Sequence, residues 1–133
     1  KEAALKCLEL TNGDLISYFE TPLGFRHGPK TIINDKTAVL LMASSDFYSS
    51  LYDADLHNEL LNDQQCLAVK KLALNTELVE LDDVWQGLYY IVYCQIFAFY
   101  KSMSLGLTPD NPCPTGEVNR VVKGVTIYPL PSR

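Results

Sequence analysis

Thr37-Ala-Val-Leu-Leu-Met-Ala43 is a continuously apolar stretch, and it decides the fold class. A short run without alternating polar residues is typical of a strand buried on both faces. Residues 46–62 then have the pattern of a helix whose inner face is formed by four leucines: Leu51, Leu56, Leu60 and Leu61. Strand candidates follow at 66–74 and 77–81. Alternating strands and helices predict an α/β layered fold with a mainly parallel sheet.

Shorter elements are predicted on both sides of this unit. Before it, we expect a helix over 1–11, a short strand over 15–19, a loop over 21–24 and a short helix from Gly28-Pro29 to 33. After it, Asp82-Asp83 precedes a helix over 84–105, and 108–116 is an extended loop. The long helix holds seven of the fourteen aromatic residues, so we expect a central packing helix or a subunit interface.

The composition excludes several classes of protein. With 133 residues, 47% hydrophobic and 20% charged, the chain is typical of one globular domain. A net charge of −5, with no basic cluster beyond Lys70-Lys71, argues against a nucleic-acid partner. Residues 84–100 carry no charge but are somewhat short for a membrane span, so a helix buried on most sides is the better interpretation.

The cysteine pattern and the N-terminus bear on the compartment. Four cysteines without CxxC spacing are interpreted as reduced core residues of a cytoplasmic protein, rather than as disulfides or zinc ligands: Cys7, Cys66, Cys94 and Cys113. We see no signal peptide. Two acidic pairs, Asp53/Asp55 and Asp82/Asp83, lack His or Cys neighbours, and we assign them to a helix surface and a helix start rather than to a metal.

Two places combine residue types that suit catalysis. His27 lies at the Gly28-Pro29 helix start, where an imidazole can face a ligand and transfer protons, or can be an ordinary loop histidine. Lys123 precedes a glycine and an apolar run, and a desolvated lysine there suits a Schiff base or an oxyanion; the alternative is an edge-strand lysine.

A third candidate is a polar stripe on the first helix. Glu2, Lys6 and Glu9 are spaced four and three residues apart, which is also the spacing of a solvated face with intrahelical ion pairs. No Walker A loop, GxGxxG or GxSxG is present. Spacing alone therefore indicates an α/β domain with one plausible site.

Taken together, three motifs in order resemble the second half of a sugar isomerase (SIS) domain protein. They are Glu2-Ala-Ala-Leu-Lys6-Cys-Leu-Glu9, Gly24-Phe-Arg-His-Gly-Pro29 and Val118-Asn-Arg-Val-Val-Lys-Gly-Val-Thr126. Residues 21–30, Pro109-Asp-Asn-Pro112 and Gly116-Glu-Val-Asn-Arg120 are similar to the AgaS group in particular. That group is known as tagatose-6-phosphate ketose/aldose isomerases and is linked to galactosamine-6-phosphate deamination.

The resemblance implies a set of roles, by comparison with the isomerase half of glucosamine-6-phosphate synthase. Glu9 would move a proton between C1 and C2, His27 would open the sugar ring, and Lys123 would lie at the carbonyl end. Three residues would support or bind the substrate: Glu2, Lys6 and Arg26. No cofactor and no metal are implied. The alternative is a non-catalytic SIS module that binds sugar phosphates to regulate a partner.

The resemblance also implies partners. It predicts a three-layer SIS-type fold in which residues 1–133 form one domain, without its first strand and glycine loop, and with 108–133 as a tail that carries Lys123. Two extra residues separate Glu9 from His27 relative to the synthase, and the phosphate-binding loop of the other SIS half is absent. We therefore expect a fragment of a two-domain chain that needs its N-terminal half and a homo-oligomer, and that alone turns over little or no phosphorylated sugar.

Overall fold

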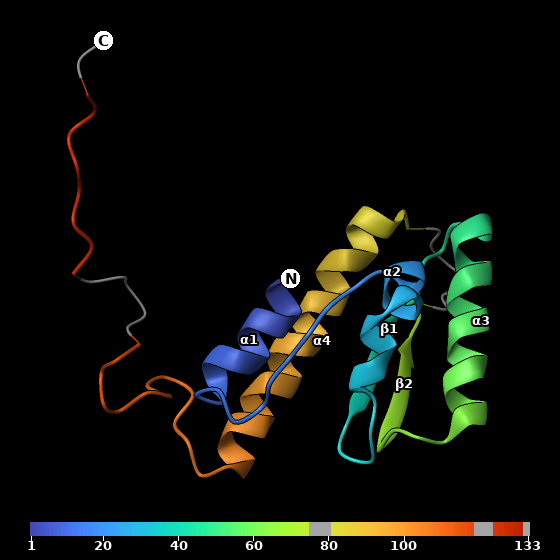
Figure 1. The fold of residues 1–133 in the computed structure, drawn as a ribbon, viewed down its shortest axis with the longest axis horizontal. Helices are drawn as coiled ribbons and strands as arrows, with labels where there is room; N and C mark the ends of the chain where they lie inside the picture. Colours follow the sequence, from blue (N-terminus) through green and yellow to red (C-terminus); the bar gives the residue numbers. More distant parts are fainter. Residues whose placement is uncertain (75–80, 119–123, 132–133) are drawn as a thin grey trace.

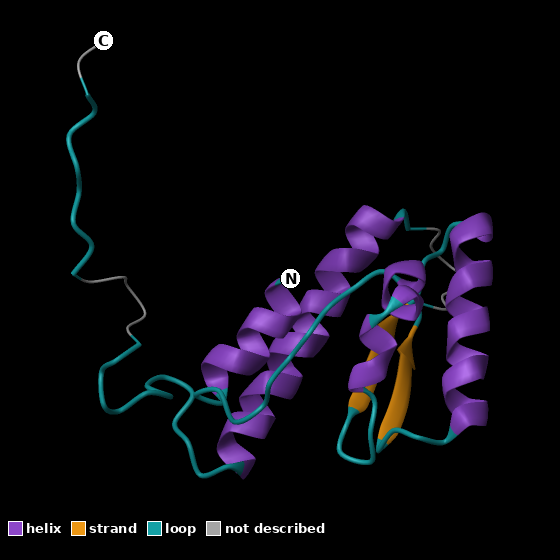
Figure 2. Cartoon of the chain, in the orientation of Figure 1, coloured by secondary structure: helices purple, strands orange, loops and turns teal. Residues whose placement is uncertain are grey.

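The computed structural model describes residues 1–74, 81–118 and 124–131. In chain order the elements are α1 (Glu2–Leu10), α2 (Pro22–His27), the 3-10 turn η1 (Pro29–Ile32), β1 (Ala38–Met42), α3 (Phe47–Asp63), β2 (Ala68–Leu72) and α4 (Asp83–Ser104). The two strands lie between α4 on one side and α3 on the other, which is the α/β class that the sequence predicts (Figures 1 and 2).

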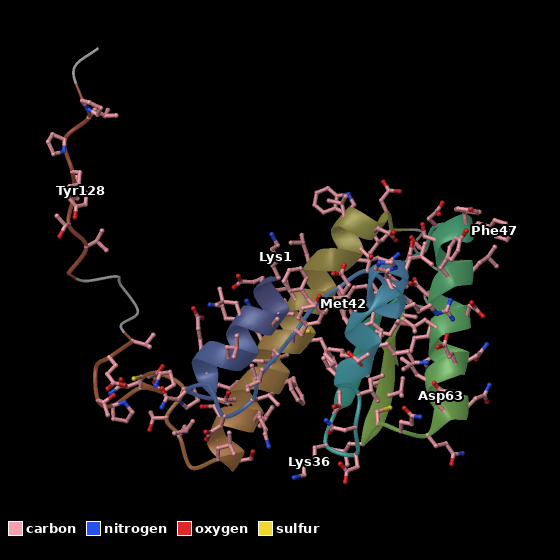
Figure 3. All side chains as sticks on the ribbon, in the orientation of Figure 1. Lys1, Lys36, Met42, Phe47, Asp63 and Tyr128 are labelled. Carbon is pink, nitrogen blue, oxygen red and sulfur yellow. The ribbon has the colours of Figure 1, made fainter. Side chains whose placement is uncertain are left out.

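The β1–α3–β2 unit forms the centre of the fold. Its strands are parallel, with Ala38 opposite Ala68 and Met42 opposite Leu72. Between them α3 begins after Asp46, whose carboxylate accepts a hydrogen bond from the Ser49 amide at 2.8 Å. Such a cap satisfies a donor that the first helical turn leaves free. Figure 3 labels Phe47 and Asp63, the two ends of α3.

The hydrophobic core lies on one face of this sheet. Leu41, Leu56 and Leu60 are buried there, and partly buried apolar side chains pack against them: Phe25, Ile33, Val39 and Val69. On the opposite face Leu40 is 36% exposed and Met42 is 40% exposed. The prediction of a strand buried on both faces is therefore wrong for this chain: α2, η1 and α3 cover one face, and α4 on the other side leaves Leu40 and Met42 more than a third exposed.

The second packing unit is the helix pair α1 and α4, which run side by side (Figure 1). The buried residues of α4 recur every fourth position: Gln86, Tyr90, Cys94, Ala98 and Ser102. Residues four apart lie on one helix face, so this stripe is the face turned inward. On α1 the buried residue is Cys7.

Within the described part of the chain, most of the apolar side chains of α4 are left exposed. Trp85, Leu88, Val92, Ile96 and Tyr100 are each more than half exposed. The prediction of a helix buried on most sides is thus wrong here, although its span and its aromatic content agree with expectation. Among the described residues, no helix is both long enough and apolar enough to cross a membrane.

Other predictions differ at particular segments. Residues 15–19 are extended but pair with no strand in the described part of the chain, so the predicted strand is wrong. Residues 22–27 form α2, which overlaps the loop predicted over 21–24, so that prediction is wrong. Most of the candidate strand at 77–81 lies outside the described residues. After α4, residues 105–118 form turns, and 124–131 have neither helix nor strand.

Candidate functional site

The polar stripe on α1 is a compact group of three charged side chains. Lys6 Nζ lies 2.6 Å from Glu9 Oε2 and 3.4 Å from Glu2 Oε1. The hydrogen bond to Glu9 raises the pKa of Lys6 above its ordinary value, so the ammonium stays charged at neutral pH. The geometry thus gives one cation between two carboxylates on an accessible helix face.

A shallow groove of about 350 Å³ runs along α1 beside this stripe. It is lined by α1 and by the extended segment that follows: Lys1, Glu2, Ala4, Leu5, Leu8, Ser17 and Phe19. Its volume is at the lower end of the roughly 300–1,000 Å³ of small-molecule sites. Of the predicted site residues, Glu2 is the one that lines it.

His27 is the last residue of α2, and its side chain is exposed. The helix begins with Thr21, whose hydroxyl accepts a hydrogen bond from the Gly24 amide at 3.2 Å, and continues with Pro22 at its first position. This Thr-Pro start is a recognisable helix signal that the expectation of a loop at 21–24 overlooked. Within the described residues, the His27 imidazole makes no hydrogen bond.

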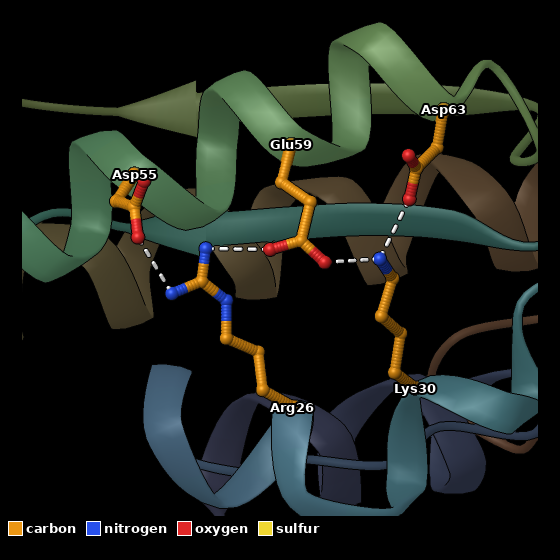
Figure 4. A network of polar contacts seen from close by, with 5 residues as sticks. All are labelled: Arg26, Lys30, Asp55, Glu59 and Asp63. Carbon is orange, nitrogen blue, oxygen red and sulfur yellow. Dashed lines mark hydrogen bonds and ion pairs between the residues drawn. The ribbon is translucent and has the colours of Figure 1, made fainter.

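Arg26, beside His27, lies in a network of ion pairs with α3 (Figure 4). Its Nη1 lies 2.7 Å from Asp55 Oδ2 and its Nη2 lies 2.5 Å from Glu59 Oε2. Lys30 of η1 binds the other oxygen of Glu59, and it lies 2.6 Å from Asp63 Oδ2. The hydrogen bond from Lys30, followed by the one from Arg26, lowers the pKa of Glu59. This carboxylate therefore joins α2 and η1 to the same face of α3.

Apart from Arg26, the residues of this network are not among the site residues that the sequence predicts. The network's signal was the spacing of Asp55, Glu59 and Asp63, which places three carboxylates on one face of a helix. Two cations of matching spacing, Arg26 and Lys30, stand upstream. Charged residues on separate short elements meet only in the folded chain, so their positions in the sequence do not show which of them form ion pairs.

The structure separates the predicted site residues into groups. Glu2, Lys6 and Glu9 lie on α1, which packs on α4, whereas Arg26 and His27 lie on α2, which packs on η1 and α3. An extended segment joins the two parts (Figure 1). Within one chain, α1 and α2 are thus not neighbours in the fold. Lys123 lies outside the described residues.

The acidic pairs have structural partners. Asp53, predicted on the helix surface, is instead 5% exposed, and its Oδ2 accepts a hydrogen bond from the Ser44 amide at 2.7 Å. Asp83 lies at the start of α4, as predicted, and accepts hydrogen bonds from the Ser44 hydroxyl and from the Ser45 amide, the latter at 2.7 Å. The Ser44 bond is the main cause that lowers the pKa of Asp83. In the described part of the chain, no group of three or more His, Cys, Asp or Glu residues is placed to hold a metal ion.

Curated relatives match the chain along nearly all of its length. It is 56% identical over 134 residues to "D-galactosamine-6-phosphate deaminase AgaS" of Shewanella sp. (strain ANA-3), covering 98% of this chain and 34% of that protein. It is 40% identical over 142 residues to the protein of the same name from Escherichia coli, covering 97% of this chain and 37% of the relative. The chain thus spans about a third of the length of these relatives.

A solved structure also matches nearly the whole length of this chain. The crystal structure of tagatose-6-phosphate ketose/aldose isomerase from Escherichia coli superposes with a TM-score of 0.83 at 35% identity, covering 98% of this chain and 36% of that one. No protein-family model matches the chain. Over nearly all of its length, the chain is a homologue of one part of the AgaS-type deaminases and tagatose-6-phosphate isomerases, as its motifs predicted.

Proposed function

We propose that this chain is the catalytic, C-terminal SIS half of an enzyme that acts on a phosphorylated sugar of the galactosamine-6-phosphate or tagatose-6-phosphate class. The observation that carries the proposal is 56% identity to a named deaminase along 98% of the chain. In our proposal residues 1–133 form a single domain of a longer cytoplasmic protein, and residues 108–133 are its tail.

The proposed chemistry moves one proton between neighbouring carbons. His27 donates a proton to the ring oxygen while the C1 hydroxyl loses its proton to solvent, so the C1–O5 bond breaks and C1 becomes an aldehyde. Glu9 takes the proton from C2 and returns it to C1, while a proton passes from the C2 hydroxyl to the C1 oxygen, and an aldose becomes a ketose. Lys123 stabilises the negative charge that develops on the C1 oxygen of the enediol intermediate.

Deamination uses the same residues with one further reactant. When C2 of the open sugar carries an amino group, the same transfer leaves a carbon–nitrogen double bond at C2. Water adds to that carbon, the C–N bond breaks, and ammonia leaves as the C2 carbonyl forms. The product is a ketose phosphate, which is the substrate class named for the matched isomerase structure.

Glu2 and Lys6 complete the proposed site on α1. Glu2 lines the groove and lies on the opposite side of Lys6 from Glu9. A lysine held charged between two carboxylates fixes their orientation and offers a donor to a sugar hydroxyl. Arg26 is the remaining predicted binding residue; both of its terminal nitrogens already bind carboxylates.

Two partners belong to the proposal. The first is the N-terminal SIS half of the parent, which we place against the exposed apolar side of α4. Trp85 is 59% exposed in this chain, so its fluorescence should be readily quenched by acrylamide here and shielded in the intact parent. Equal quenching in both would contradict this placement. The second partner is another subunit, because α1 and α2 stand apart within one chain and their catalytic groups then meet between subunits.

The function is tested with Glu9→Gln and His27→Ala in the intact parent. We expect at least a 100-fold loss of ammonia release and of aldose–ketose interconversion in each variant, because general acid–base catalysis contributes roughly 10²–10⁴-fold. Matched controls are Glu117→Gln, on an exposed turn, and His57→Ala, on α3, which should keep near wild-type rates. Wild-type turnover in either test variant would refute the assigned roles. Binding of sugar phosphate by the wild-type parent without turnover would favour a regulatory module instead.

A further inference from the structure

Glu59 binds two cations that flank the predicted catalytic histidine. Its Oε2 lies 2.5 Å from Arg26 Nη2, and its Oε1 accepts the bond from Lys30 Nζ. Figure 4 shows the carboxylate on α3 between the two side chains. The three residues that lie between Arg26 and Lys30 in sequence are His27, Gly28 and Pro29. We call Arg26, Lys30 and Glu59 the Glu59 clasp.

The segment held by the clasp consists of two short elements, anchored in the core by Phe25 before His27 and by Ile33 after it. α2 has six residues and ends at His27, whereas η1 starts at Pro29. A helix this short is not stable alone. Phe25 anchors one side of α2 in the core, but it leaves the direction of the next residues to other contacts. Ion pairs supply those contacts. Arg26, before the break between α2 and η1, and Lys30, after it, each bind two carboxylates of α3.

The ion pairs of the clasp are partly shielded from solvent. The side chains of Arg26, Lys30 and Glu59 are 24%, 26% and 32% exposed. Partly covered pairs are screened less by solvent than fully exposed ones. Arg26 also uses both terminal nitrogens of its planar fork, which defines its orientation more sharply than a single contact.

The same charges argue against direct binding of a phosphate by Arg26. Its two terminal nitrogens face Asp55 and Glu59, and Asp63 stands one turn further along α3. The network holds three carboxylates against two cations, so its net charge is negative. An incoming anion would have to displace a carboxylate and would meet the repulsion of the others.

We propose that Glu59 is a positioning residue for His27, and that Arg26 contributes to the reaction through the clasp rather than by touching the sugar. The proposal rests on the function above, in which His27 opens the ring. Its physical basis is that a displacement of about 1 Å of a catalytic group can cost on the order of 100-fold in rate. Breaking the clasp frees the His27 backbone without removing its imidazole.

The test is a double-mutant cycle in the intact parent. Glu59→Gln keeps the size of the side chain but removes the charge that binds both cations. We expect kcat to fall 10- to 100-fold, with KM within about twofold. In the His27→Ala background, the same change should lower kcat by less than twofold, because the group that it positions is already gone. Asp63→Asn, which removes a carboxylate whose ion pair among the described residues is with Lys30 alone, should change kcat by less than threefold.

The outcomes separate the two proposals. Wild-type turnover by His27→Ala overturns the proposed function. Two results would overturn the positioning role alone. One is a slow His27→Ala enzyme in which Glu59→Gln lowers kcat by the same factor as in the wild type. The other is a Glu59→Gln enzyme with normal kcat. If Glu59→Gln does not fold, Arg26→Lys replaces it, since an ammonium keeps the charge but lacks the planar fork that fixes the direction of both contacts. The proposal then requires that Arg26→Lys lower kcat 10- to 100-fold in the wild type and by less than twofold in the His27→Ala background.

Discussion

Tyr90 joins α4 to the carboxyl end of β1, and its hydroxyl provides a measurable test of that junction. The hydroxyl donates a hydrogen bond to the Ala43 carbonyl oxygen at 2.7 Å, and its oxygen lies 2.8 Å from Gln86 Oε1. Tyr90 is 5% exposed and Ala43 is 5% exposed, so water does not readily replace the bond. Burial raises the pKa of the Tyr90 phenol, which keeps it as a donor.

The substitution Tyr90→Phe removes one oxygen atom and leaves the ring in place. A typical hydrogen bond contributes about 0.5–1.5 kcal/mol, and leaving a buried partner unpaired costs about 1–3 kcal/mol. The Ala43 carbonyl loses its described donor, so we expect the free energy of unfolding to fall by about 1–2 kcal/mol. With a urea dependence of about 2 kcal/mol per molar, the midpoint should fall by roughly 0.5–1 M.

The assay is urea unfolding followed by circular dichroism, with Tyr89→Phe as the matched control. Tyr89 is the neighbouring residue on α4 and is 52% exposed, so the loss of its hydroxyl should change the free energy of unfolding by less than about 0.5 kcal/mol. Equal urea midpoints for the two variants would refute the conclusion that the Tyr90 hydroxyl stabilises the contact between α4 and the sheet.

Three further predictions concern stability. Leu60→Ala should lower the free energy of unfolding by about 2–5 kcal/mol, because Leu60 is 1% exposed; Leu61→Ala, at a residue 48% exposed, should cost far less in the same urea titration. Asp46→Ala removes the acceptor of the Ser49 amide and should cost about 1 kcal/mol, seen as faster hydrogen exchange in the first turn of α3. The pKa of Glu59 is lowered by Lys30, so its stabilising effect is present above the ordinary carboxyl pKa and is lost as the pH falls through the lower folded value. Melting temperatures from pH 7 to 3 should therefore fall less in Glu59→Gln than in the wild type.

The elements that sequence predicted well are those with strong local signals. Asp46 before an apolar pattern marked the start of α3, and Asp82-Asp83 marked the start of α4. The apolar residues at 37–43 correctly predicted a strand. Apolar composition alone, however, does not show whether other elements cover one face of that strand or both. Leu56 and Leu60 are buried, whereas Leu51 and Leu61, predicted on or near the same inner face, are about half exposed.

The candidate site was predictable only in part, for a related reason. The stripe of Glu2, Lys6 and Glu9 follows from helical spacing alone, and the structure has the ion pairs that this spacing predicts. The clasp depends on two contacts, between residues 29 and 33 positions apart, which no local pattern contains. Sequence reasoning therefore finds the chemistry on one helix more easily than the support that another helix provides.

The pairing of α1 with α4 also sets an order of events during synthesis. α1 ends at Leu10 and α4 ends at Ser104, so about ninety residues must be made between them. At roughly 5–20 residues per second, the first helix leaves the ribosome about 5–20 seconds before its partner is complete. The β1–α3–β2 unit, by contrast, closes within a span of 35 residues from Ala38 to Leu72 and can form during that delay. The contacts between α1 and α4 are therefore among the last that the described part of the chain can complete, and α1 is not covered by α4 until then.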